Sequence, residues 1–156
     1  MIDIVIDTCT LKHASNSKNK YFDQSVEFIN KMEINDVKCT VDEGFAFDET
    51  LNKSYVGLEY IKHLQPGTPG YSLIVNLASN ERIVFVTNVI PNNKKNRIEQ
   101  LIVNKKDRMF LRVAYNSSEK VLASHDFTDY KKSKRKTIKK EFNILIVTAE
   151  EIIGEL

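Results

Sequence analysis

Four acidic residues stand where the sequence predicts the end of a strand or the start of a helix. Asp7 directly follows the apolar run IDIVI, and Asp126 comes two residues after the run VLAS. Asp107 lies near the start of the helical pattern DRMFLRVA, and Glu49 is expected to open a helix over about 48–64. Functional groups of open α/β sheets collect outside the carboxyl ends of the strands, so these four carboxylates are expected to converge.

Carboxylates that crowd together raise one another's pKa, and a bound divalent cation removes that conflict. Oxygen ligands of this kind suit Mg²⁺ or Mn²⁺, which keep several waters and otherwise bind carboxylates and phosphates. Two such ions about 4 Å apart could activate a water for attack on a phosphodiester. The competing interpretation is that acids at helix starts complement the helix dipole, which explains Asp107 or Glu49 singly. It explains Asp7 and Asp126 poorly, because neither is expected to open a helix.

Several neighbours of these acids are further candidates. Asp129 is either another metal ligand or the cap of a helix that starts near Tyr130. The hydroxyls of Thr8 and Ser124 are expected to hold a metal-bound water or to orient a carboxylate. His125 is expected to point away from its two neighbours and to be exposed, with contact to the substrate as the alternative.

The most basic stretch of the chain follows directly. Residues 131–140, KKSKRKTIKK, contain seven Lys or Arg in ten positions, and residues 89–156 contain 15 Lys or Arg against 9 Asp or Glu. The stretch is either a solvated helix face or a surface that binds phosphates without reading bases. No base-stacking platform is visible, although aromatic residues lie nearby. The proposed contacts to an RNA backbone are Lys131, Lys132, Lys134, Arg135 and Lys136.

Short apolar runs alternate with helical patterns along the chain, and this alternation predicts the fold class. It indicates an α/β three-layer sandwich, with a mainly parallel sheet of four to five strands flanked by helices, in a single domain over 1–156. Strands are expected at 2–6, 37–41, 83–86, 121–124 and 144–147. Helices are expected from about 21, over 48–64, over 71–78, in two parts between 95 and 116, over 130–142, and after a Thr148 cap.

Composition narrows the class of protein. The chain is 42% hydrophobic and 28% charged, which is ordinary for a folded soluble protein. No apolar run approaches the roughly 18–20 residues that span a bilayer, and the acidic start MIDIVID is unlike a signal peptide. Cys9 and Cys39 are too few for a zinc framework, so reduced thiols and a cytoplasmic protein are expected.

Three segments together resemble a PIN domain. They are IVIDTCTLKHAS, KKDRMFLRVAYNSSEKVLASHDFTDY and ILIVTAEEIIGEL, and they cover the chain in the family's order. The family pattern falls on Asp7-Thr8, on Asp107 heading D-x-x-Φ-Φ-x-x-A, and on Ser124-His125-Asp126. The chain departs from the pattern at Cys9, where Asn or Ser is common. The family's Glu falls on Glu49, with Glu43, Asp42 and Glu59 as alternatives.

The resemblance implies an endoribonuclease that uses Mg²⁺ or Mn²⁺, and many bacterial members of the family are toxins of toxin–antitoxin pairs. The expected partners are therefore RNA, an antitoxin or other protein, or a second copy of the chain, and not a membrane. Two alternatives remain open. One is a PIN-like module that binds RNA or protein without cleaving, and the other is a structure-specific DNA nuclease with the same metal site.

Overall fold

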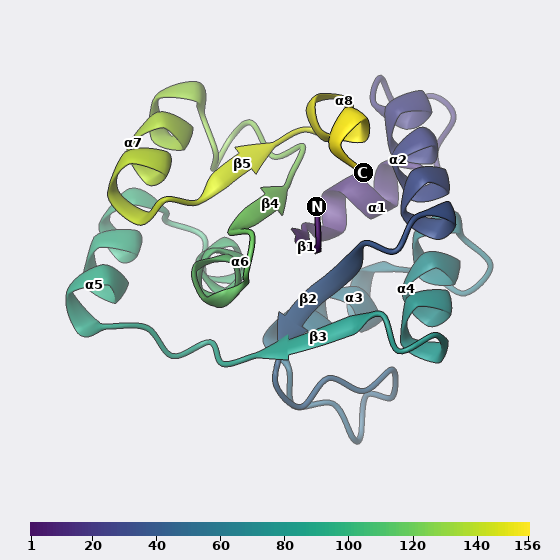
Figure 1. Ribbon diagram of the computed structural model, residues 1–156, viewed down its shortest axis with the longest axis horizontal. Helices are drawn as coiled ribbons and strands as arrows, with labels where there is room; N and C mark the ends of the chain where they lie inside the picture. The colour runs from purple at the N-terminus through teal and green to yellow at the C-terminus, as the bar shows by residue number, and fades with distance from the viewer.

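Five short strands pair side by side into one parallel sheet in the computed structural model, which describes residues 1–156 (Figure 1). Their order across the sheet is β3-β2-β1-β4-β5, and every neighbouring pair is parallel. The α/β fold class predicted from the sequence is therefore confirmed. The strands are β1 (Asp3–Ile6), β2 (Lys38–Asp42), β3 (Ile83–Val86), β4 (Val121–Ala123) and β5 (Leu145–Val147).

Eight helices and one short 3₁₀ helix connect and cover these strands. Helix α2 packs against α4 and α8 over one face of the sheet, whereas α6 lies against β1, β2 and β4, and α7 against β5 (Figure 1). None of the helices is long and apolar enough to cross a membrane. The helices are α1 (Thr8–His13), α2 (Phe22–Ile34), α3 (Tyr55–His63), α4 (Pro69–Ser79), α5 (Asn92–Leu101), α6 (Lys105–Asn116), α7 (Lys132–Phe142) and α8 (Ala149–Ile152), followed by Ile153–Glu155.

The strand order reverses between β1 and β4. From β1 the chain proceeds outward to β2 and β3, and it later returns beside β1 to add β4 and then β5. The backbone N–H of Asp7 continues the pairing by donating to the carbonyl of Ala123 at 2.9 Å. Open α/β sheets bind ligands outside the carboxyl ends of the strands at such a reversal. The topology therefore places Asp7 and the residues after β4 at the position where a site is expected.

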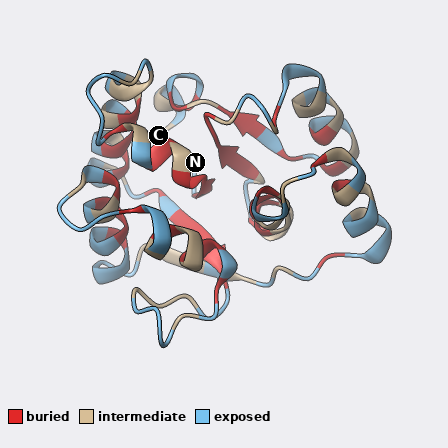
Figure 2. Ribbon diagram, turned by 180° about the vertical axis from the view of Figure 1, so that it is seen from behind, coloured by how far each residue is buried: buried red, intermediate tan, exposed pale blue.

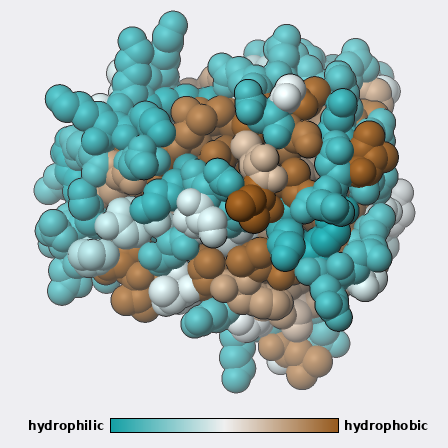
Figure 3. Space-filling model, viewed as in Figure 1, coloured by the Kyte–Doolittle hydropathy of each residue, from teal (hydrophilic) through white to brown (hydrophobic).

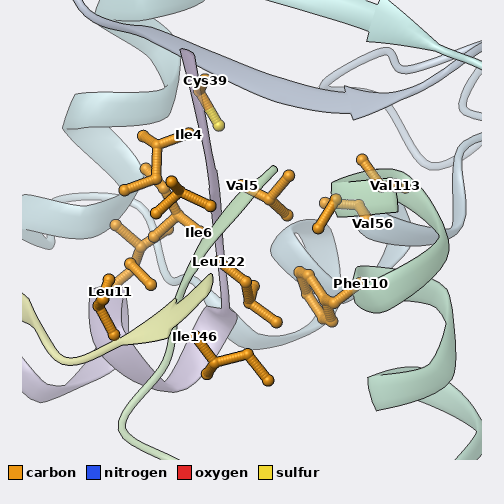
Figure 4. Packing of buried hydrophobic residues seen from close by; sticks show 14 of the residues in the cluster. Ile4, Val5, Ile6, Leu11, Cys39, Val56, Phe110, Val113, Leu122 and Ile146 are labelled. Atoms are coloured by element: carbon orange, nitrogen blue, oxygen red, sulfur yellow. The ribbon is translucent and has the colours of Figure 1, made fainter. Parts of the chain in front are cut away.

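The core lies on both faces of the sheet, where buried residues follow the strands and the inner sides of the helices (Figure 2). Val5 of β1, Val56 of α3 and Phe110 of α6 meet in it (Figure 4). Two fully buried tyrosines also donate hydrogen bonds there. Tyr60 donates to the carbonyl of Ile6 at 2.6 Å, and Tyr130 donates to the carbonyl of Asp107 at 2.8 Å. The second bond ties the loop after β4 to the first turn of α6.

Most predicted elements are confirmed within a few residues, including the break between α5 and α6 and the Thr148 capping box at α8. The helix predicted over 48–64 is wrong in its first turns. It begins at Tyr55, because the Ser54 hydroxyl accepts the N–H of Gly57 and caps it. Residues 48–51 instead form a turn in which Asp48 accepts hydrogen bonds from Thr50 and Leu51.

Two further helix starts differ from what the sequence led us to expect. The sequence did not predict α1, and its N-cap is Asp7, whose side chain accepts the N–H of Cys9. Asp7 therefore does open a helix. Helix α7 begins at Lys132 rather than near Tyr130, and its N-cap is Lys131, so Asp129 does not cap it. Cys9 and Cys39 are free thiols, as predicted.

Candidate metal centre

Asp107 lies in the first turn of α6 with its carboxylate buried. Asn104 caps this helix by accepting the N–H of Lys106, and the buried side chains of Phe110 and Leu111 fix the helix against the sheet. Asp107 is only 1% exposed, and neither of its carboxylate oxygens receives a hydrogen bond. An ionised carboxylate in such a place costs free energy unless a positive charge or a donor compensates it.

Asp126 and Asp129 come from the loop after β4 and face Asp107. One carboxylate oxygen of Asp126 accepts the backbone N–H groups of Thr128 at 2.8 Å and of Asp129 at 2.9 Å, so Asp126 shapes the loop that carries Asp129. Both acids are half-buried. Each of the three residues offers one oxygen that lies within 4.8 Å of the other two. A single cation could bind all three oxygens together.

Asp7 lies beside this group but outside it. It is 4% exposed, and its two oxygens accept the N–H of Cys9 at 3.3 Å and the hydroxyl of Ser124 at 2.6 Å. The Ser124 oxygen in turn accepts the N–H of Asp126 at 3.0 Å. Ser124 therefore links Asp7 to the loop of Asp126. The hydroxyl of Thr8 is buried without a hydrogen-bond partner.

The electrostatics of the cluster favour a bound cation. Burial is the largest cause, and with the nearby Asp129 carboxyl and the charges of Asp7 and Asp126 it raises the pKa of Asp107 to about 8. When Asp107 is ionised, no group of the protein donates a hydrogen bond to its oxygens. Burial also raises the pKa of Asp7, with a smaller contribution from the charge of Asp126, against the hydrogen bonds of Ser124 and Cys9. A cation would reverse the effect of the neighbouring charges on both groups.

The structure does not bring the expected glutamate into this cluster. Glu49 is exposed in the turn before α3, and Glu43 is exposed directly after β2. Glu59 lies on α3, where its carboxylate pairs with His63 at 3.5 Å. None of these three belongs to the group of acids within 4.8 Å.

Asp42, the remaining alternative, is buried at the end of β2, but its two oxygens already accept four hydrogen bonds. Its oxygens accept hydrogen bonds from the hydroxyl of Ser54 at 2.5 Å, the N–H of Tyr55 at 2.8 Å, the N–H of Val56 at 3.0 Å and the amide of Asn88 at 3.0 Å. Four donors satisfy the charge of this carboxylate and fix the start of α3 to the sheet. Asp42 has a structural role.

The basic stretch lies on α7, where hydrophilic side chains cover the surface (Figure 3). Lys131, Lys132 and Lys136 are exposed, and Lys134 is half-buried. Arg135 differs from them, because its guanidinium donates to the carbonyls of Tyr130 at 2.7 Å and Ser124 at 3.2 Å. The guanidinium of Arg135 therefore holds the loop that carries Asp126 and Asp129. The side chains of the four lysines make no such hydrogen bond.

A ring cluster next to the acids was missed by sequence reasoning. His125 is 4% exposed rather than exposed, and its Nε2 accepts the N–H of Ala149 at 3.0 Å. Its Nδ1 lies 3.0 Å from that of His13, and Tyr21 packs against both His125 and Phe127. Burial, followed by the charges of His13 and Arg135, lowers the pKa of His125 to about 4, so this ring is neutral. The rings come from segments more than 100 residues apart, which no local pattern could reveal.

Comparison of the chain with protein-family models, with curated proteins and with solved structures gives no match.

Proposed function

We propose that the protein is a metal-dependent endoribonuclease of PIN-like type, which hydrolyses phosphodiester bonds of RNA. One observation carries the proposal. Asp107 is buried with both oxygens unpartnered, and it faces Asp126 and Asp129 across less than 4.8 Å. Buried charges of one sign require a counter-charge, and three carboxylates are the ligands that Mg²⁺ and Mn²⁺ prefer.

The residues around the cluster fit such an ion. Asp107, Asp126 and Asp129 would bind it. Ser124 would fix the position of Asp7 relative to the loop that carries Asp126, because it donates to Asp7 and accepts the N–H of Asp126. When bound, Mg²⁺ or Mn²⁺ would polarise the phosphate and lower the pKa of a water. Tyr130 and Arg135 hold the loop against α6 and β4, so the three ligands have fixed positions.

RNA is the proposed substrate for two reasons. The exposed lysines of α7 follow directly after the acid cluster in the chain, and phosphate contacts of this kind bind a polyanion without reading its sequence. The ordered motifs resemble PIN domains, which commonly cleave RNA. An antitoxin or other protein partner belongs to the same proposal.

The test is cleavage of single-stranded RNA in Mn²⁺ or Mg²⁺ and in EDTA, by wild type and by Asp107→Asn and Asp126→Asn. We expect cleavage only with metal, and a loss of about 100-fold or more in both variants. Asp36→Asn is the matched control, because Asp36 is exposed and precedes β2, at the edge of the parallel sheet opposite to the carboxyl ends of the strands. Its rate should stay within about twofold of wild type.

Three results separate the alternatives. Equal rates for wild type and both acid variants would place the active site elsewhere. RNA binding without cleavage under any metal would favour the non-catalytic module. Faster cleavage of single-stranded or branched DNA than of RNA would favour the DNA nuclease.

A further inference from the structure

A cavity of about 440 Å³ lies between α3, α5 and α6. This volume is in the range of pockets that bind small molecules, about 300–1,000 Å³. The cavity adjoins the acid cluster along the chain, because Lys106 and Arg108 line it and flank Asp107 on α6. None of the three clustered acids lines it, so it is a separate feature of the surface.

The charges of the cavity favour an anion. Five Lys or Arg residues line it against two Glu. The two arginines are already occupied: Arg112 pairs with Glu99 at 3.6 Å, and Arg108 donates to the carbonyl of Ile102 at 2.7 Å. The three lysines have exposed side chains that make no hydrogen bond or ion pair within the protein. These lysines are Lys95, Lys105 and Lys106.

The same cavity also offers an aromatic ring and apolar surface. Tyr55 is 57% exposed at the start of α3, and Val56, Leu58 and Met109 also line the cavity. The backbone of Tyr55 is fixed, because its N–H donates to the buried carboxylate of Asp42 at 2.8 Å. A large exposed ring on a rigid helix start is suited to stack on a planar ligand.

We propose that this cavity binds one nucleotide, with its base against Tyr55 and its phosphate between Lys105 and Lys106. Neither a purely apolar molecule nor a bare anion would use both the lysines and the apolar lining. The identification of this nucleotide as the one next to the cleaved bond of an RNA strand rests on the proposed function. The binding of a free nucleotide to the cavity does not depend on the proposed function.

The experiment is an NMR titration of the ¹⁵N-labelled full chain with adenosine 5′-monophosphate, in EDTA so that no metal takes part. We expect the amide signals of Tyr55, Asn88 and Met109 to shift. Ribose 5-phosphate, which has the phosphate but no base, should bind about fivefold or more weakly, given the usual strength of base stacking. Equal affinities for the two probes would overturn the role of Tyr55, and shifts confined to α7 would overturn the site.

Two variants test the basic and the aromatic part of the lining. The double variant Lys105→Ala, Lys106→Ala and the single variant Tyr55→Ala should each weaken binding of the nucleotide by about fivefold or more. Lys18→Ala with Lys38→Ala is the matched control, since both side chains are exposed and outside the cavity. All these positions are exposed, so the spectra away from the cavity should match that of wild type. Unchanged affinity in both cavity variants would contradict the proposal.

One more variant separates this inference from the proposed function. Asp126→Asn should bind the nucleotide within about twofold of wild type while losing RNA cleavage, because Asp126 does not line the cavity. If the nucleotide binds in the cavity but no RNA is ever cleaved, the cavity remains and the nuclease proposal fails. If RNA is cleaved but the nucleotide never shifts the signals of the cavity, the nuclease proposal stands and the cavity proposal fails.

Discussion

Two buried carboxylates, at the end of β2 and at the start of α6, have opposite surroundings. Asp42 is 0% exposed and accepts hydrogen bonds from four donors, whereas Asp107 is 1% exposed and accepts none. Burial is the same, so burial alone does not identify a site. The difference lies in which groups satisfy the charge. The protein itself supplies donors for Asp42, whereas the ionised form of Asp107 finds none in the chain and is stable only with a proton or a bound cation.

The largest expected effect on stability is at Asp42. Asp42→Ala would leave four buried donors without an acceptor, and we expect the free energy of unfolding to fall by about 3 kcal/mol. Urea unfolding monitored by circular dichroism measures this, with Asp36→Ala as an exposed control. A fall of less than about 1 kcal/mol would show that the donors find other partners and that Asp42 is not structural.

A smaller change of opposite sign is expected at Asp107. In the unfolded chain an Asp has a pKa of about 3.9, and in the fold the pKa of Asp107 is raised to about 8. The folded protein therefore binds an additional proton between these values, and its stability falls as the pH rises through that interval. Asp107→Asn cannot ionise, so its stability should fall less.

Urea unfolding of wild type and Asp107→Asn in EDTA measures this difference. Between pH 5 and pH 8 we expect the variant to gain about 2 kcal/mol relative to wild type, below the full linkage value because Asp107 titrates together with its acidic neighbours. Parallel stability curves would mean that the carboxylate of Asp107 is compensated in the metal-free protein. The contrast with Asp42 would then disappear.

The smallest effect is expected at Glu49. Its side chain is exposed and outside the cluster, so Glu49→Gln should change RNA cleavage and Mn²⁺ affinity by less than about twofold. Cleavage rates and Mn²⁺ titrations of this variant beside Asp126→Asn give the comparison. A loss as large as that of Asp126→Asn would show that the turn 48–51 closes over the acids when metal binds.

The sequence predicted the fold well because its signals are local. The β-branched runs at 83–86 and 144–147 and the Thr148 capping box each lie within a few residues. Helix starts were predicted less well, because they depend on contacts with distant segments. Helix α3 begins at Tyr55 since Asp42, thirteen residues earlier, receives its first N–H groups.

The candidate site was predicted only in part, because some of its features follow from local patterns and others from contacts between distant segments. Asp107, Asp126 and Asp129 could be named, because strand ends and helix starts are visible in the pattern of residues. The structural role of Asp42 could not be predicted, because it depends on hydrogen bonds that only the folded chain defines. The burial of His125 against His13 and Tyr21 is a long-range contact of the same kind.

The most direct test of the central claim is binding of Mn²⁺ at pH 8, measured from the electron paramagnetic resonance signal of the free ion. We expect wild type and Asp36→Asn to bind at least one Mn²⁺ with equal affinity, and Asp107→Asn to bind it about tenfold or more weakly. If Asp107→Asn binds Mn²⁺ as tightly as wild type, the unpartnered carboxylate of Asp107 is not a metal ligand, and the account of the site is wrong.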